Sequence, residues 1–351
     1  MNRRIFLGTA AGLAFSHASA TWFGAATPGQ TGKPRLKIGF LGAAYSHAEA
    51  KLKLMQGHPD FELVGAWDSD PKVRSEVAAM GVPVISQSEI LSVSQVVAVE
   101  SVVRDHARLA QVALAAGKHV HLEKPPSLSM AEFKEAVRLA RERQLILQVG
   151  YQYRYSPCFN TVIEAVRKGW LGQVYMVRAT MNNQLAVKRR AEWGEYAGGV
   201  MFELGSHMVD VIVRLLGRPV KISPFLFTHG RFNDSFKDNT TAIFEYPTAI
   251  ASLSCATFQP NSSAYRALEV LGTQGTAVIR PIEPPTLALD LAKEAGPYKA
   301  GINNLEWPKW ERFVGDFAEL AVTARGDGPP AVSLEEDLTV QETLLLASGM
   351  A

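Results

Sequence analysis

The stretch Ala115–Phe133, which reads AAGKHVHLEKPPSLSMAEF, decides the fold. A glycine ends a predicted helix, a short apolar strand follows, and a Ser-x-x-Glu capping box at Ser129 begins the next helix. The two prolines after Lys124 have no N–H group to donate, so the strand ends there. A lysine is therefore presented at the carboxyl end of a strand, which is where open α/β sheets bind their ligands.

Strands and helices alternate on both sides of this stretch. Amphipathic helices are predicted at residues 47–56, 71–80, 104–117 and 129–143, between apolar strands at 36–42, 61–67, 95–99, 118–123 and 145–150. Strand–helix alternation with short connections is typical of a doubly wound parallel sheet. The sequence therefore predicts an α/β fold whose N-terminal part, residues 35–155, is a Rossmann domain.

The pattern changes after Tyr155. Helices are predicted at about 157–168 and 200–216, and strands at 173–182, 240–246, 249–258 and 267–279. The last three strands follow one another without intervening helices, which indicates an antiparallel sheet. Residues 156–351 are therefore expected to form an α+β domain with a mostly antiparallel open sheet, ending in helices at 309–324 and 333–349.

Composition narrows the class of protein. The 351 residues are 47% hydrophobic and 20% charged, which provides enough apolar sequence for two ordered domains. The net charge is +2 and the basic residues are scattered, so no nucleic-acid partner is expected. No apolar run is long enough to span a bilayer, so no membrane span is expected. Cys158 and Cys255 are compatible with a disulfide in an exported protein, but their apolar contexts favour buried free thiols.

Residues 1–20 have the layout of an export signal. Arg3 and Arg4 precede an apolar stretch, and Ala18-Ser19-Ala20 forms a small-residue cleavage site. The paired arginines resemble a twin-arginine signal, whose machinery exports folded proteins. We therefore expect a signal peptide at 1–20, a linker at 21–34 and a periplasmic or otherwise exported protein; a weakly ordered N-terminal helix is the alternative.

The first strand leads into a turn, residues 39–47, that is placed like a dinucleotide-binding loop. Gly42 fills the first glycine position, Ala44 stands where the second glycine is usual, and Tyr45 follows, so these three residues are expected to bind the cofactor. The N–H groups at the start of the next helix suit a phosphate. Asp68 ends the second strand, where a carboxylate accepts hydrogen bonds from the ribose of NAD and repels a 2′-phosphate. NAD is the expected cofactor, although two basic residues shortly after this carboxylate keep NADP open.

The helix predicted at about 200–216 carries polar residues at spacings of four, three and four, which places them on one face: Glu203, His207, Asp210 and Arg214. A solvated polar face is the ordinary interpretation of such a pattern. Glycines at positions 198, 199 and 205 favour the close approach of a ligand instead. One histidine with two carboxylates is a poor ligand set for a transition metal, so no metal site is predicted.

Three motifs together resemble the glucose–fructose oxidoreductase and inositol dehydrogenase family, known as Gfo/Idh/MocA: AAGKHVHLEKPPSLSMAEF, GYQYRYSP and GGVMFELGSHMVD. The resemblance implies a Rossmann domain followed by an α/β domain whose open sheet often joins subunits, so a homo-oligomer is expected. It also implies that Lys124 is the catalytic or substrate-orienting lysine, that Glu123 completes its signature, and that His207 is the acid–base group. Glu203 stands where the family usually has Asp, and Arg154 matches an arginine near the nicotinamide.

These observations predict an oxidoreductase that transfers hydride between nicotinamide and a sugar, polyol or related hydroxyl compound, while Lys124 and His207 handle the hydroxyl proton. Two alternatives stay open: an NAD-dependent glycosidase of the same fold, and a non-catalytic sugar or nucleotide sensor. Residues 182–199, with Trp193 and Tyr196, are expected to line the substrate pocket. The Lys124–Pro125 bond is expected to be cis, and an exported enzyme of this kind is expected to retain its cofactor.

Overall fold

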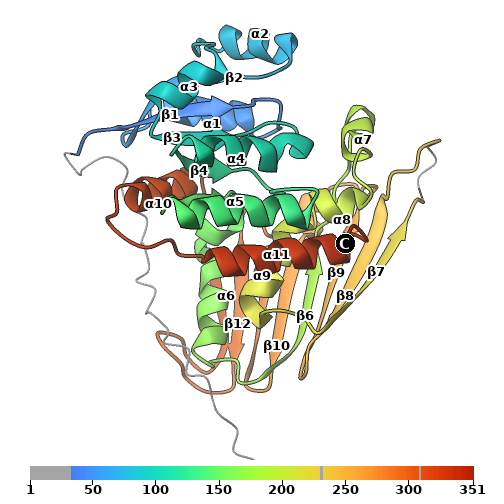
Figure 1. The fold of residues 1–351 in the computed structure, drawn as a ribbon. Coiled ribbons are helices and arrows are strands. Elements are labelled where there is room, and N and C mark those ends of the chain that lie inside the picture. The colour runs from blue at the N-terminus through green and yellow to red at the C-terminus, as the bar shows by residue number, and fades with distance from the viewer. Residues whose placement is uncertain (1–32, 230–231, 308–309) are drawn as a thin grey trace, which may run out of the picture.

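The computed structural model describes residues 33–229, 232–307 and 310–351. The predicted signal peptide at 1–20, and all but the end of the predicted linker at 21–34, lie outside these residues. Figure 1 shows two regions: an N-terminal one, in blue to green, lies above a large sheet formed by the C-terminal one. Within the described residues, no helix is both long enough and apolar enough to cross a membrane.

The N-terminal domain contains five parallel strands in the order β2-β1-β3-β4-β5, which confirms the doubly wound sheet. The strands are β1 (Leu36–Leu41), β2 (Phe61–Trp67), β3 (Val96–Val99), β4 (His119–Leu122) and β5 (Leu147–Val149). The helices are α1 (Ala48–Gln56), α2 (Pro71–Ala79), α3 (Gln87–Val93), α4 (His106–Ala115) and α5 (Met130–Glu142), with a 3₁₀ turn, η1 (Val103–Asp105), before α4. Asp70 and Ser129 accept backbone N–H groups at the starts of α2 and α5, which fixes where these helices begin.

The loops that leave β3 and β4 are bonded to each other through a histidine. The Lys124–Pro125 bond after β4 is cis, as predicted. His106, at the start of α4, places Nδ1 2.8 Å from the Pro125 carbonyl oxygen and Nε2 2.9 Å from the Ser101 carbonyl oxygen. Burial lowers the pKa of His106, so the ring is neutral and its single N–H donates to one of these two carbonyls while the ring packs between both loops.

A helix from far along the chain completes the N-terminal domain. α10 (Val314–Ala324) packs on the same face of the parallel sheet as α1, in a core that contains Ile38 and Phe40. The ring of Phe317 lies 6.0 Å from that of Phe61 and 4.7 Å from that of His121. Figure 1 shows α10, in red, next to the N-terminal domain. Part of this domain's hydrophobic core is therefore supplied by the C-terminal part of the chain.

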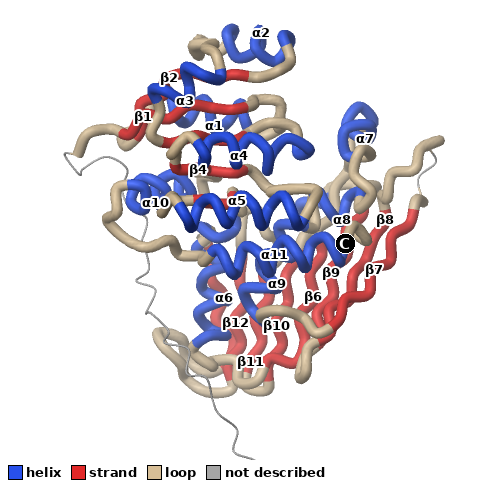
Figure 2. Tube along the Cα trace, viewed as in Figure 1, coloured by secondary structure: helices blue, strands red, loops and turns tan. Residues whose placement is uncertain are grey.

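The C-terminal sheet has eight strands in the order β13-β12-β11-β10-β6-β9-β8-β7. Figure 2 shows strands of this sheet, in red, below the N-terminal domain. β6 and β9 pair in parallel, and the other neighbouring strands described for this sheet are antiparallel. The strands are β6 (Val174–Thr180), β7 (Lys221–Phe227), β8 (Asn239–Glu245), β9 (Ile250–Ala256), β10 (Ala267–Gly272), β11 (Gly275–Ile279), β12 (Thr286–Leu291) and β13 (Gly301–Glu306). The mostly antiparallel second domain is confirmed.

Three of these strands were absent from the sequence prediction. β7 and β13 are the edges of the sheet, so they lack the alternation of buried and exposed residues that a half-buried strand shows. β7 also contains Pro224, which has no N–H for a ladder hydrogen bond. β12 alternates clearly and the prediction simply missed it.

Helices cover one face of the large sheet. In Figure 1, α6 (Pro157–Arg167), α9 (Ser206–Leu216) and α11 (Leu334–Ala347) lie across it, below the N-terminal domain. Shorter elements complete the domain: η2 (Gln152–Tyr155), α7 (Val187–Trp193), α8 (Gly199–Glu203) and η3 (Ser262–Tyr265). Cys158 and Cys255 are buried free thiols, as favoured by their apolar contexts.

The single helix predicted at about 200–216 is wrong, because the chain forms α8 and α9 with a break between them. At Gly205, a Cβ atom would lie 2.4 Å from the Met201 carbonyl oxygen. Only a glycine permits this close approach, so its role is to reorient the chain rather than to admit a ligand. The break decides the directions of the polar side chains on either side of it.

Candidate active site

Lys124 is buried at the boundary between the two domains. Its side chain is 3% exposed, and Nζ donates to the backbone oxygen of Glu203 at 3.0 Å and to Oε1 of the same residue at 2.9 Å. An exposed ion pair at a strand end would explain the charges of the EKPP motif, but this burial excludes that interpretation. The end of β4 therefore brings the ammonium group to a residue of the C-terminal domain.

The Glu203 carboxylate joins two residues from different loops of the N-terminal domain. Its Oε1 atom accepts from Lys124 and also from the hydroxyl group of Tyr45, at 2.5 Å. The Lys124 Nζ atom lies 5.2 Å from the centre of the Tyr45 ring. Oε2 of Glu203 is buried and has no hydrogen-bond partner among the described residues. One carboxylate oxygen thus accepts two hydrogen bonds, while the other is buried without a partner among the described residues.

His207 is a buried, neutral imidazole. Burial and the nearby Lys124 ammonium hold the pKa of His207 well below its ordinary value. Its Nδ1 atom has no hydrogen-bond partner in the described part of the chain, and the rings of Tyr153 and Tyr151 lie 5.3 and 6.5 Å from the imidazole ring. A neutral imidazole with an unpartnered ring nitrogen is able to accept a proton, and its lowered pKa makes it a weaker base than an exposed histidine.

The four polar residues predicted on one helical face do not act together. Asp210 accepts from Nε of Arg154 at 2.9 Å and from Nη2 at 2.6 Å, and the same guanidinium donates to Asp337 at 2.6 Å. These buried ion pairs join α9 and α11 to the segment after β5. Arg214, the fourth residue, has its Nε atom 4.0 Å from Glu336. The Arg154 guanidinium thus forms ion pairs that join parts of the fold. A contact between Arg154 and the nicotinamide stays a prediction.

The turn after β1 fits a phosphate group. Gly42 has φ of +86°, and a Cβ atom there would lie 2.4 Å from Ser101, so only glycine is tolerated. The N–H of Tyr45 donates to the Glu100 carbonyl oxygen at 2.9 Å. The N–H groups of Ala44, Ser46 and His47 have no partner within the described residues, just before the start of α1. Unpaired N–H groups at a helix start suit a pyrophosphate.

The carboxylate at the end of β2 braces this turn. Oδ2 of Asp68 accepts the Ala43 N–H at 2.8 Å, and Oδ1 accepts the Asp70 N–H at 2.9 Å. Each carboxylate oxygen keeps further lone pairs for a ribose hydroxyl group, whereas the negative charge repels a 2′-phosphate. The position and charge of Asp68 fit NAD better than NADP.

The predicted pocket loop, residues 182–199, folds in part into α7. Trp193 and Tyr196 are both buried, at 4% and 6% exposure. The indole Nε1–H of Trp193 is buried and has no partner among the residues that the structure describes. Contact of either side chain with a substrate stays a prediction.

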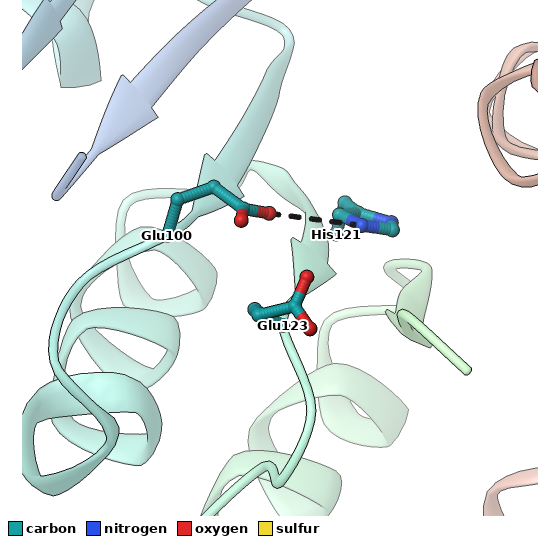
Figure 3. A group of neighbouring side chains, drawn as sticks. All are labelled: Glu100, His121 and Glu123. Atoms are coloured by element: carbon teal, nitrogen blue, oxygen red, sulfur yellow. Dashed lines mark ion pairs between the residues drawn. The ribbon is translucent and has the colours of Figure 1, made fainter. Parts of the chain in front are cut away.

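A second buried charge cluster lies inside the N-terminal domain, and the sequence analysis missed it. Figure 3 shows Glu100, His121 and Glu123 converging at the ends of β3 and β4. The Lys51 ammonium, from α1, donates to Glu100 at 2.7 Å, lies 3.0 Å from Nε2 of His121 and donates to Glu123. Lys51 lies four residues before the buried Met55 and therefore on the same face of α1. A lysine on the apolar face of a helix was the feature of the sequence that could have indicated a buried charge cluster. A metal ion could enter this group of side chains only by displacing the ammonium.

This cluster contains one ammonium group and two carboxyl groups, and protonation of one carboxyl group balances the charge. Burial raises the pKa of Glu100 to about 8, against the opposing effect of Lys51. Burial also disfavours ionised Glu123, but Lys51 and His47 outweigh it and hold the pKa of Glu123 well below its ordinary value. Burial and Lys51 lower the pKa of His121 to about 3. At neutral pH one ammonium therefore pairs with one carboxylate, and Glu100 is largely protonated.

A parallel sheet with a glycine turn after β1, a carboxylate after β2 and a buried lysine after β4 defines a dinucleotide-binding domain of the oxidoreductase type. Residues 36–151 match the family model described as an oxidoreductase family with an NAD-binding Rossmann fold, and residues 159–278 match that of the GFO/IDH/MocA C-terminal domain. The chain belongs to the Gfo/Idh/MocA family of oxidoreductases, as its three motifs predicted, and its N-terminal domain is the NAD-binding one.

Known proteins share the sequence in part and the fold throughout. Trans-1,2-dihydrobenzene-1,2-diol dehydrogenase of Macaca fuscata fuscata is 33% identical over 188 residues, which are 52% of this chain and 54% of the relative. The chain spans about half the length of the curated relatives it matches. GenD2 from gentamicin A biosynthesis, solved in complex with NAD, superposes with a TM-score of 0.75 at 22% identity, over 92% of this chain and 96% of that one. UDP-N-acetylglucosamine 3-dehydrogenase GnnA from Acidithiobacillus ferrooxidans superposes with a TM-score of 0.75 at 18% identity, over 91% and 98%.

Proposed function

We propose that the protein is an NAD-dependent dehydrogenase that oxidises a CH–OH group of a sugar, a polyol or a related hydroxyl compound. One observation carries this proposal: Lys124, Glu203 and His207 meet in a buried site at the carboxyl edge of the Rossmann sheet. Lys124 has one N–H donor left and His207 has an unpartnered ring nitrogen. These are the two groups that the oxidation of a hydroxyl group requires.

The residues divide the chemistry between them. The remaining Lys124 donor binds the substrate oxygen and orients it, and the neutral His207 accepts the hydroxyl proton. Glu203 holds the ammonium of Lys124 in place. NAD, when bound at the turn after β1 and at Asp68, supplies the acceptor for the hydride, which leaves the substrate carbon that carries the hydroxyl group. Near-complete burial of the three side chains excludes water from the reacting atoms.

The substrate class is drawn from the fold and from the relative with the highest identity cited above. The name of that relative specifies a dehydrogenase acting on a diol carried by a ring. A ring that bears neighbouring hydroxyl groups is common to such a diol, to sugars and to inositols. We therefore place the substrate of this chain among cyclic compounds with neighbouring hydroxyl groups.

The test is spectrophotometric. Purified protein is incubated with NAD or NADP and a panel of free sugars, sugar nucleotides, inositols and trans-dihydrodiols, and the absorbance of the reduced nicotinamide is followed. Saturable NAD reduction with at least one member supports the proposal. Release of sugar from aryl glycosides without net NADH would favour the glycosidase alternative, and binding of sugar without either reaction would favour a sensor.

Retention of the cofactor is part of this proposal. The site is closed by contacts between the domains, which is expected to slow the release of a bound dinucleotide. A retained cofactor has to be reset in place by a second substrate, which predicts ping-pong kinetics without added NAD. Denaturing the purified protein and quantifying the released dinucleotide tests this; substoichiometric cofactor, with activity that rises saturably on adding NAD, contradicts it.

Export through the twin-arginine route is likewise proposed, on the basis of Arg3 and Arg4. Replacing both by lysine is expected to leave full-length precursor in the cytoplasm. Cell fractionation with an antibody against the protein measures this. Cleaved protein in the periplasm of the double variant would point to an ordinary secretory route.

A homo-oligomer that forms through the large sheet completes the proposal. Large apolar side chains on and beside this sheet are exposed, among them Tyr175, Phe225 and Ile250 at 45%, 51% and 50%. Such exposure on strands is typical of a surface that a partner covers. Light scattering of the purified protein measures its mass, and a monomer would contradict the expectation.

A further inference from the structure

We infer that Tyr45 is a positioning residue of the reaction, which acts through Glu203 on Lys124 and thereby connects the cofactor turn to the catalytic lysine. This inference rests on the proposed dehydrogenase function. The sequence placed Tyr45 in the dinucleotide turn as a cofactor-binding residue. Its side chain instead leaves the turn and reaches the C-terminal domain, where its hydroxyl group donates to Oε1 of Glu203.

The backbone of Tyr45 is fixed on the cofactor side. Its N–H donates to the Glu100 carbonyl oxygen, and two residues earlier the Ala43 N–H is held by Asp68. The free N–H groups of Ala44 and Ser46 lie on either side of Tyr45 in the chain. A phosphate bound by those amides would therefore constrain the same backbone segment that aims the phenol ring.

The side chain of Tyr45 is fixed by its packing. It is 5% exposed, and its ring lies 5.2 Å from that of His47, 5.7 Å from that of His106 and 5.2 Å from Nζ of Lys124. Burial and the Glu203 carboxylate raise the pKa of Tyr45 far above its ordinary value, so the hydroxyl group stays protonated and acts as a donor. A phenol held in this way keeps the carboxylate from rotating.

Glu203 stands where an aspartate was expected, and its carboxylate reaches donors from two different loops of the N-terminal domain. The carboxylate has two donors to satisfy, Lys124 from the end of β4 and Tyr45 from the turn after β1. Tyr45 occupies one approach to Oε1, so Lys124 is left with a single direction from which to donate. The third N–H of Lys124 then points to a defined place, which is the condition for orienting a substrate oxygen.

The experiment is a double-mutant cycle with Tyr45→Phe and Glu203→Gln, measured by steady-state kinetics on the substrate found in the panel. Tyr45→Phe removes one hydroxyl group and is expected to lower kcat by about 10-fold with the KM for NAD unchanged. In the Glu203→Gln background the same change is expected to cost less than about 3-fold, because a residue that acts through another loses its effect when that residue is altered. The acid limb of the pH–rate profile is also expected to move in Tyr45→Phe.

Tyr246→Phe is the matched control. Its hydroxyl group donates to the Gly217 carbonyl oxygen at 3.2 Å, and among the described residues no hydrogen bond joins this hydroxyl group to Lys124, Glu203 or His207. Its kinetics are expected to equal those of the wild type. The same cycle is measured by urea unfolding of the protein without cofactor, where Tyr45 and Glu203 are expected to be coupled as well, since the contact exists there.

Each outcome has a distinct meaning. Multiplicative losses of kcat in the double variant would overturn the inference, and an increase in the KM for NAD alone would return Tyr45 to the role of a cofactor ligand. Coupling in unfolding without coupling in kcat would show a merely structural contact. If none of the hydroxyl compounds in the panel leads the wild type to reduce NAD, the proposed function itself fails, and the role of Tyr45 in the reaction fails with it.

Discussion

Glu123 and Lys124 are neighbours in the chain, yet their side chains belong to two different charge clusters. Glu123 points into the N-terminal domain, where the Lys51 ammonium has three acceptors. Lys124 points across the domain boundary and donates to two atoms of one residue, Glu203. A lysine ammonium has three N–H donors, so Lys51 is saturated and Lys124 retains one.

The difference separates a structural lysine from a chemical one. A buried ammonium whose donors are all satisfied has nothing to offer a ligand, and its removal leaves buried carboxylates uncompensated. A buried ammonium with one donor left has been desolvated without being fully paired, which is tolerable where a substrate completes the set. We therefore expect loss of Lys51 to affect stability first and loss of Lys124 to affect turnover first.

The largest expected effect comes from Lys51→Met. The ionised Glu123 would then lie beside the protonated Glu100 in a fully buried site without the Lys51 ammonium, which costs about 3–5 kcal/mol of the free energy of unfolding. Urea unfolding followed by circular dichroism measures it. Lys53→Met is the matched control, because Lys53 lies on the same helix and pairs with Glu49 at the surface. A stable Lys51→Met variant would show that the cluster contributes little.

Lys124→Ala and His207→Ala test the other half of the comparison. Each is expected to lower kcat/KM by about 100-fold or more, the usual scale for a positioned acid–base group, while the NAD affinity changes less. Kinetics on a verified substrate and titration calorimetry with NAD measure the two quantities. Near-normal turnover in both variants would remove these residues from the catalytic assignment.

Stability is expected to fall as the pH rises from about 6.5 to about 8. The folded protein raises the pKa of Glu100 from 4.5 to about 8 and that of Asp316 from 3.8 to about 7, so both hold protons that the unfolded chain releases. Since the native state binds more protons in this window, the free energy of unfolding decreases with pH, by at most about 1.4 kcal/mol per pH unit for each proton. His121 has the opposite sign but titrates below this window.

Urea midpoints at several pH values measure this slope. Glu100→Gln is expected to make it shallower, because the amide does not titrate. A slope that is unchanged in Glu100→Gln would assign the pH dependence to other groups.

The smallest expected effect is that of Glu49→Gln. Glu49 and Lys53 form an ion pair at the protein surface, four residues apart on α1. Solvent screens such a pair, so the urea midpoint is expected to stay at the wild-type value. A clear loss of stability in this variant would contradict the expectation that exposed ion pairs on α1 contribute less to the free energy of unfolding than buried ones.

Features of the fold that depend on short-range sequence patterns were predictable. Strand–helix alternation predicted the N-terminal sheet, and the prolines after Lys124 placed that residue at a strand end. The partners of Lys124 were not predictable, because Tyr45 and Glu203 come from opposite domains and meet only in the folded chain. The break at Gly205 was read as a ligand approach, since a glycine that reorients a helix looks the same in the sequence.

The placement of α10 also has a consequence for the order of synthesis. The ribosome releases β1 to β5 early, but the helix that packs against Ile38 and Phe40 consists of residues Val314–Ala324. Domains usually fold as units during translation, N-terminal first. Here the first domain emerges with an apolar patch uncovered and waits for the second domain to be translated before it closes. A nascent chain arrested after β5 would therefore expose that patch to chaperones. Both domains would complete their folding at about the same time, near the end of translation.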